Sequence, residues 1–98
     1  MKNLSEKPEV YFFYASWCGA SRGIKPYVDD LSVEYENVTN WHSYDIAVGG
    51  NIDIYNNFTN DLNKSQRLIP MVFVNNIRLT GPTQINDSME KAILDSLK

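Results

Sequence analysis

A near-continuous apolar run from Val10 to Ala15 constrains the fold more than any other feature of this chain. The run is short and β-rich, as expected of a strand buried at the centre of a sheet. A turn at Ser16 to Gly19 follows it directly, and a helical pattern begins after that turn. The sequence therefore predicts a central strand that leads through a turn into a helix.

Apolar residues recur at helical spacing in three segments, which predicts three amphipathic helices. The first helix ends at Asn37 to Asn40, and Pro26 inside it removes a backbone N–H and predicts a local kink. The second covers roughly Ile52 to Leu62, after a break at Gly49 to Asn51, and the third follows a break at Gly81-Pro82. The apolar stripes are Ile24, Tyr27, Val28, Leu31 and Tyr35 in the first helix and Ile85, Met89, Ala92, Ile93 and Leu97 in the third.

Three further apolar segments predict strands. Trp41 to Ile46 is the second strand, and Met71 to Val74 and Ile77 to Leu79 form a hairpin around a turn at Asn75-Asn76. Lys64 to Leu68 is expected to be a loop. The resulting order is βαβαββα, an α/β pattern whose alternating first half favours parallel strands joined by crossovers.

The net charge, the length and the numbers of cysteine and histidine residues limit what this protein can bind. The net charge of -3 provides no electrostatic footprint for nucleic acid or an anionic membrane surface, and no apolar run is long enough to span a bilayer. A chain of 98 residues has no room for two cores, so residues 1–98 are expected to form one domain. The protein is also expected to be a monomer. One cysteine and one histidine predict no internal disulfide and no metal site.

Cys18, the only cysteine, lies at the predicted junction of the first strand and the first helix. Backbone N–H groups and the helix dipole favour the thiolate there, and the thiolate is the reactive form. The pKa of Cys18 is therefore expected to lie below that of free cysteine, and Ser21, one turn into the helix, is expected to donate its O–H to the thiolate. An inert, half-buried thiol is the alternative, but the predicted helix N-terminus favours a nucleophile.

The segment from Phe13 to Ser21 resembles the thioredoxin active site, in which Trp-Cys-Gly-x-Cys follows the central strand. Pro26 stands eight residues after Cys18, where that family has a helix-kinking proline, and Arg22 occupies its basic position. Ile69-Pro70, just before the predicted hairpin, resembles the family's cis-proline. The resemblance covers nearly the whole chain after its N-terminal segment.

This resemblance implies a thioredoxin fold, a mixed four-stranded sheet flanked by helices, and the activity of a thiol–disulfide oxidoreductase. Cys18 would attack the substrate disulfide, and Ser21 would occupy the position of the resolving cysteine. The backbone of Ile69 would pair with an extended substrate segment beside a cis Pro70. The implied partners are disulfide-containing protein substrates and a thiol reductant or reductase, and no cofactor is expected. The implied substrate-binding residues are Trp17, Gly19, Ala20, Ile69 and Pro70.

Two positions depart from the family pattern. Ser21 stands where a dithiol enzyme has the cysteine that resolves the mixed disulfide, and a serine hydroxyl cannot perform that step. Phe12 stands six residues before Cys18, where thioredoxins usually carry a buried aspartate that helps proton transfer. The chain therefore resembles a divergent relative that cannot complete the dithiol cycle alone.

Three interpretations of Ser21 stay open. The serine replaces a native cysteine by design, marks a natural monothiol site, or marks a relative that only binds its partners. The monothiol interpretation resembles glutaredoxins that use glutathione or hold an iron–sulfur cluster, although Trp17 fits thioredoxin better. The binding-only interpretation keeps the thioredoxin surface for a protein partner without catalysis.

Two sequence features bear on the cellular compartment of the protein. The polar N-terminal segment lacks the apolar core of a signal peptide, which favours a cytoplasmic setting. Asn-x-Ser/Thr triplets, the acceptors of N-glycosylation, hint at the alternative of an extracytoplasmic chain. These triplets begin at Asn3, Asn37, Asn57, Asn63 and Asn86.

Overall fold

The computed structural model describes residues 6–98 and follows the predicted βαβαββα order, with one short 3-10 helix, η1, added before the third strand. Asn3, the start of one Asn-x-Ser/Thr triplet, lies outside the described residues, as do the first residues of the polar N-terminal segment. Across residues 6–98, no helix is both long and apolar enough to cross a membrane. The elements are β1 (Glu9–Tyr14), α1 (Gly19–Glu34), β2 (Asn40–Asp45), α2 (Asn51–Phe58), η1 (Lys64–Gln66), β3 (Met71–Val74), β4 (Ile77–Thr80) and α3 (Pro82–Ser96).

The four strands form one mixed sheet in the order β2-β1-β3-β4. The strand β1 runs parallel to β2, which it reaches through the crossover helix α1, and antiparallel to β3. The hairpin pairs β3 with β4. In the register of the sheet, Tyr14 lies opposite Asp45 and Phe13 lies opposite Met71. The end of β1, the end of β2 and the start of β3 therefore meet at the same edge of the sheet, which we call the β1 exit edge.

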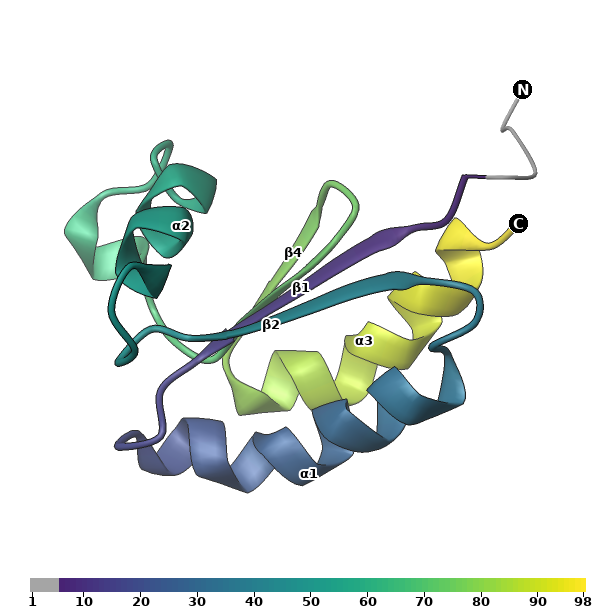
Figure 1. The fold of residues 1–98 in the computed structure, drawn as a ribbon, viewed down its shortest axis with the longest axis horizontal. Helices are drawn as coiled ribbons and strands as arrows, with labels where there is room; N and C mark the ends of the chain where they lie inside the picture. Colours follow the sequence, from purple (N-terminus) through teal and green to yellow (C-terminus); the bar gives the residue numbers. More distant parts are fainter. Residues whose placement is uncertain (1–5) are drawn as a thin grey trace.

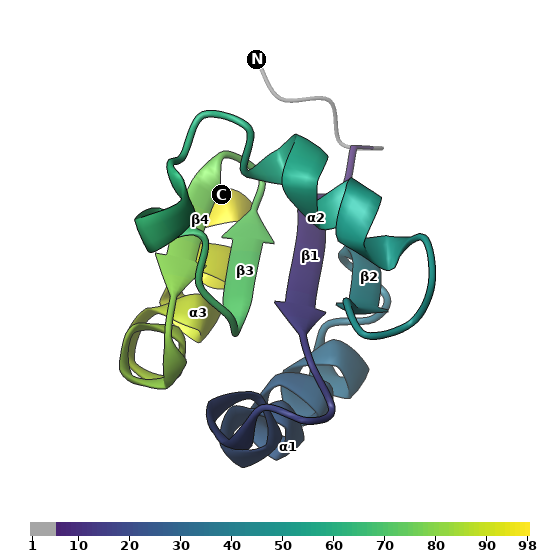
Figure 2. The same ribbon diagram turned by 90° about the vertical axis from the view of Figure 1, so that its left-hand side faces the viewer.

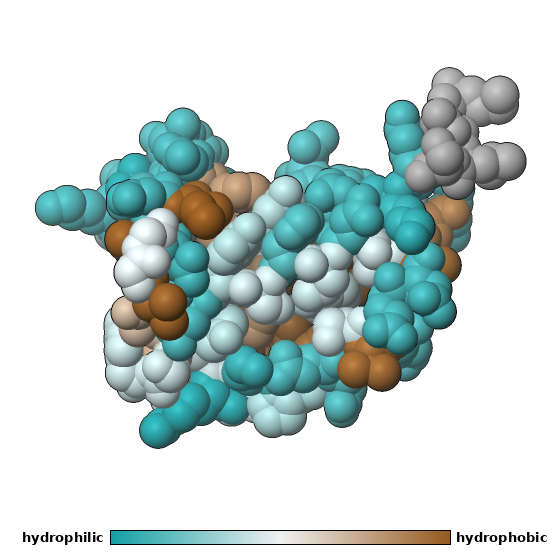
Figure 3. All heavy atoms as spheres, viewed as in Figure 1, coloured by the Kyte–Doolittle hydropathy of each residue, from teal (hydrophilic) through white to brown (hydrophobic). Residues whose placement is uncertain are grey.

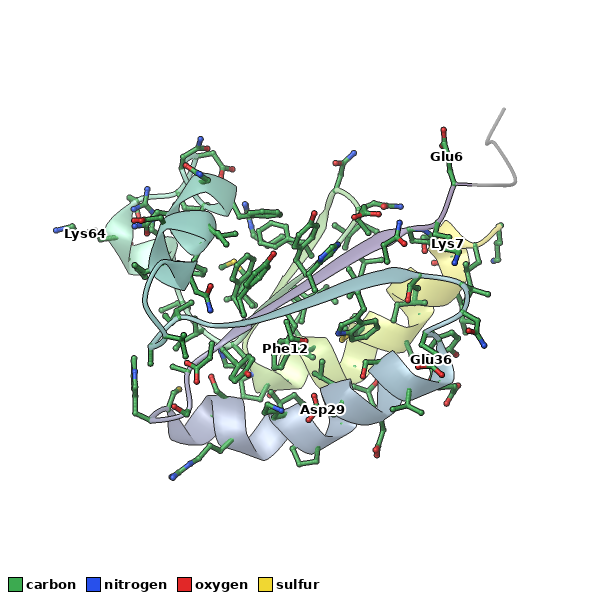
Figure 4. All side chains as sticks on the ribbon, in the orientation of Figure 1. Glu6, Lys7, Phe12, Asp29, Glu36 and Lys64 are labelled. Carbon is green, nitrogen blue, oxygen red and sulfur yellow. The ribbon has the colours of Figure 1, made fainter. Side chains whose placement is uncertain are left out.

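Helices cover the two faces of the sheet unequally. Figure 1 shows α1 and α3 side by side under one face, whereas α2 lies over the opposite face, toward the β1 exit edge. The view in Figure 2 separates the same three layers. Phe12, which is fully buried, points from β1 into the layer of α1 and α3 (Figure 4). Its neighbour Phe13 points to the other face and belongs to a smaller cluster with Tyr55, Met71 and Phe73.

The second helix differs from its prediction. The apolar spacing predicts a helix from Ile52 to Leu62, but α2 ends at Phe58. The hydroxyl of Thr59 donates to the carbonyl of Tyr55, and the chain then turns away from the helix axis. A new turn starts at Asn63, whose side chain accepts a hydrogen bond from the backbone N–H of Gln66 while the side chain of Gln66 accepts one from the N–H of Asn63. This reciprocal capping produces η1 where a loop was expected.

Candidate functional site

Cys18 is the N-cap residue of α1, directly after the turn that leaves the β1 exit edge. Its N–H donates to the carbonyl of Ala15 (3.0 Å), and its own carbonyl accepts the first helical hydrogen bond, from the N–H of Arg22 (3.0 Å). The N–H groups of the first helical turn lie beside this position without helical partners. Cys18 is half-buried, whereas Trp17 is 68% exposed. The thiol is therefore anchored by its backbone and is open to solvent on one side.

The surroundings of Cys18 lower the pKa of its thiol. The largest cause is a hydrogen bond from the backbone N–H of Ser21, followed by one from the Ser21 side chain. The backbone N–H of Ala20 and the charge of Arg22 act in the same direction, and partial burial opposes them. These donors stabilise negative charge on the sulfur, as expected at a helix N-terminus.

Ser21 is fully buried under the turn that carries Cys18. Its Oγ accepts a hydrogen bond from the N–H of Ala15 at 3.2 Å. A hydroxyl that accepts one hydrogen bond is free to donate another, and the Ser21 side chain is the second-largest cause of the lowered pKa of Cys18. Ser21 therefore holds Ala15, the first residue after β1, and favours the Cys18 thiolate, but it provides no second thiol.

The loop that ends at Pro70 lies at the same edge of the sheet as the Cys18 turn. The Ile69–Pro70 peptide bond is cis, the geometry that the sequence resemblance implies. Pro70 is buried, and its carbonyl accepts a hydrogen bond from the N–H of Gly81 at 2.9 Å. Because Met71 pairs with Phe13, the loop before β3 and the turn after β1 leave the sheet side by side.

Exposed apolar side chains gather at the β1 exit edge. Besides Trp17, they include Leu68 (54% exposed) and Val48 (57% exposed), which lie in the connections before β3 and after β2. Gly19 and Ala20 are also exposed. Figure 3 shows hydrophobic side chains on the end of the molecule near α2. Exposed apolar side chains therefore occur in three segments that leave or enter the sheet at the β1 exit edge, where the Cys18 turn also lies.

A shallow groove of about 380 Å³ lies between the first turns of α1 and α3. Ala20 and Gly23 line it from α1, and Pro82 and Thr83 line it from α3. Only Ala20 among these residues was a predicted site residue. The sequence carried no signal for the groove because it arises from the packing of two helices that are far apart along the chain.

Other notable side chains stay away from Cys18. His42 lies on β2, where its Nε2 is 3.1 Å from Glu9 Oε1 and its ring stacks on Tyr11. Glu9 begins β1, so this pair lies at the far end of the strand from the Cys18 turn. Phe12 is enclosed by core residues. Within residues 6–98, no group of three or more His, Cys, Asp or Glu side chains is arranged to hold a metal ion.

Comparison with curated proteins finds a short, well-matched segment. Over 43 residues the chain is 44% identical to thioredoxin O1, mitochondrial, and to thioredoxin O2, mitochondrial, both from Arabidopsis thaliana. The segment is 44% of this chain but only 22% and 26% of those two relatives. No family model matches the chain.

Comparison with solved structures extends the similarity to most of the chain. The oxidized form of thioredoxin O1 from Arabidopsis thaliana is 30% identical, with a TM-score of 0.56, and the match covers 87% of this chain and 77% of that one. Fasciola hepatica thioredoxin is 19% identical, with a TM-score of 0.68 over 95% of this chain and 84% of that one, a likeness of fold alone. The predicted mixed sheet flanked by helices is thus confirmed as this shared fold.

Proposed function

The chain belongs to the thioredoxin-like superfamily, and on that premise we propose that it is a thiol–disulfide oxidoreductase with Cys18 as its nucleophile. Members of the thioredoxin family within it are disulfide oxidoreductases. The Cys18 thiolate attacks one sulfur of a substrate disulfide and forms a mixed disulfide with it. The old S–S bond breaks, and the second substrate sulfur leaves as a thiolate that takes a proton from solvent.

The observation that carries this proposal is the position of Cys18 at the N-cap of α1. The backbone N–H and the side chain of Ser21 lower the pKa of the Cys18 thiol, so the thiolate is favoured in a half-exposed position. A structural cysteine in an apolar core has the opposite surroundings. The cis Ile69–Pro70 loop at the same edge supports docking of an extended polypeptide beside the sulfur.

The missing second cysteine determines how the reaction ends. Ser21 cannot attack the mixed disulfide, because an alcohol is not a nucleophile for sulfur under these conditions. A thiol from outside the chain therefore attacks the Cys18 sulfur of the mixed disulfide, so the substrate leaves as a thiolate and the external thiol becomes disulfide-bonded to Cys18. A second external thiol then attacks the first one, which frees the Cys18 thiolate and leaves the two external thiols joined as a disulfide. The expected partners are disulfide-containing proteins and such a thiol reductant. The monomeric state and the cytoplasmic setting stay predictions.

Restoring the second thiol tests the proposal. We expect Ser21→Cys to reduce insulin in a dithiothreitol-dependent turbidity assay. The chain with Ser21, incubated with insulin in the absence of dithiothreitol, should stop at a mixed disulfide that is visible by mass spectrometry. Adding Cys18→Ala to the Ser21→Cys variant is the control, and it should abolish the activity. A folded Ser21→Cys variant without insulin reduction would contradict the proposed function and favour a binding-only role.

A further inference from the structure

A buried tyrosine of α2 reaches the loop that carries the cis-proline. Tyr55 is 4% exposed, and its phenol donates a hydrogen bond to the carbonyl of Leu68 at 2.9 Å. Leu68 stands two residues before Pro70, so the contact falls on the segment that the proposed function uses for substrate docking. Burial raises the pKa of Tyr55, and the nearby charge of Arg67 only partly opposes this effect. The phenol therefore remains a donor throughout the neutral range.

The ring of Tyr55 is itself fixed by the sheet. It packs edge-on against Phe13, with ring centroids 5.4 Å apart and an interplanar angle of 67°. Phe13 lies on β1 in the register position opposite Met71, the first residue of β3. The phenol thus connects the loop to the strand that leads directly into the Cys18 turn.

Further hydrogen bonds connect the segment before Pro70 to the C-terminal end of α2. Arg67 Nε donates to the carbonyl of Thr59 at 3.1 Å, and the hydroxyl of Thr59 donates to the carbonyl of Tyr55 at 2.8 Å. The N–H of Leu68 donates to the carbonyl of Gln66 at 3.1 Å. The carbonyl of Leu68 is therefore turned toward α2, while its side chain stays 54% exposed.

From this geometry we propose that Tyr55 is a positioning residue for disulfide exchange at Cys18. Its phenol holds the Leu68–Pro70 loop in the orientation in which the backbone of Ile69 can pair with an extended polypeptide substrate. Tyr55 touches neither the sulfur nor the substrate, so it affects polypeptide docking and leaves the chemical step unchanged. The inference rests on the proposed function and deepens it, because it separates polypeptide disulfides from small disulfides as substrates.

The experiment compares two disulfides that share a leaving group. One is a peptide whose cysteine is linked to thionitrobenzoate, and the other is Ellman's reagent, which has no polypeptide backbone. Attack by Cys18 on either compound releases the coloured thionitrobenzoate anion, so the chain can be assayed with Ser21 in place. We expect Tyr55→Phe to raise the half-saturating peptide concentration about threefold to tenfold, the loss typical of one hydrogen bond. The limiting rate, its pH profile and the reaction with Ellman's reagent should stay within about twofold of the parent chain.

Tyr35→Phe is the matched control. The phenol of Tyr35 donates to Glu90 at 2.7 Å and ties α1 to α3, so this variant makes the same chemical change away from the loop. We expect it to leave both reactions unchanged.

Four outcomes would overturn the inference. If the parent chain prefers the peptide and Tyr55→Phe keeps the same half-saturation, only the positioning role of Tyr55 is wrong. An equal slowing of the peptide and of Ellman's reagent in Tyr55→Phe would also contradict that role. If the parent chain shows no preference for the peptide, docking at the Ile69 loop and the positioning role of Tyr55 are wrong, whereas the proposed function fails as well only if the parent chain attacks neither compound. If Tyr55→Phe does not fold, Arg67→Gln is tested instead, because it removes the adjacent hydrogen bond from Arg67 to the carbonyl of Thr59. It must raise the half-saturating concentration of the peptide without changing the reaction with Ellman's reagent. An unchanged half-saturating concentration in Arg67→Gln would overturn the inference.

Discussion

The hydroxyl of Ser21 stabilises the Cys18 thiolate, although it cannot resolve a mixed disulfide as a second thiol would. Ser21 is fully buried, and its Oγ accepts a hydrogen bond from the N–H of Ala15. Its side chain also lowers the pKa of Cys18. The backbone N–H of the same residue is the largest cause of the lowered Cys18 pKa, and that group does not depend on the side chain. The backbone at the helix start therefore supplies the largest single contribution to the stabilisation of the thiolate, and the serine side chain adds to it.

Removing the hydroxyl should make the thiol less acidic. In Ser21→Ala, the pKa of Cys18 is expected to rise while staying below its ordinary value, because the backbone donors remain. Alkylation by iodoacetamide follows the thiolate population, which is lost as the pH falls through the pKa. The variant should therefore react roughly threefold to tenfold more slowly near neutral pH, as expected for one lost hydrogen bond. Alkylation profiles of the two proteins that superimpose would show that the hydroxyl does not stabilise the sulfur.

At the scale of elements, α1 contains a glycine that its surroundings do not require. Gly23 is exposed in the interior of the helix, and a Cβ built there meets no atom within 4 Å. Glycine in a helix interior is less favourable than alanine by roughly 0.5–1 kcal/mol. We expect Gly23→Ala to raise the free energy of unfolding by about that amount, measured as a higher urea midpoint with an unchanged m-value. A lowered midpoint would contradict this prediction.

Gly81 provides the opposite case in the turn before α3. Its φ of +86° and ψ of 158° lie in a region that is essentially restricted to glycine, and its N–H is bonded to the carbonyl of Pro70. Space for a Cβ is available there as well, so only the backbone conformation distinguishes the two glycines. Gly81→Ala is the comparison variant, and it should lose roughly 1–3 kcal/mol of stability.

On the scale of the whole molecule, α3 closes the larger core against the sheet. Ile93 is fully buried in the cluster between the sheet and the two helices, whereas its neighbour Leu94 is 46% exposed. Ile93→Ala should reduce the free energy of unfolding by about 2–5 kcal/mol, because the packed layers cannot collapse into the space left behind. Leu94→Ala should change it by no more than about 0.5 kcal/mol. Urea denaturation of both variants measures the difference, and equal losses would show that the core is not packed as described.

The sequence by itself determined the order and type of the strands and main helices. Local periodicity distinguishes a buried run such as Val10 to Ala15 from the amphipathic helix that follows, and neither pattern depends on distant residues. The same local chemistry located Cys18 at a helix start, where adjacent backbone donors stabilise its thiolate.

Local hydrogen bonds that the apolar spacing does not reveal end α2, whereas only the tertiary structure decided what this helix contacts. The apolar spacing continues to Leu62, but hydrogen bonds of Thr59 and Asn63 stop the helix and begin another turn. The contact between Tyr55 and Leu68 has no periodic signature, because it forms only when α2 packs on the sheet beside Phe13. Contacts of this kind depend on where separate elements meet in space, and that information is absent from the local pattern of the chain.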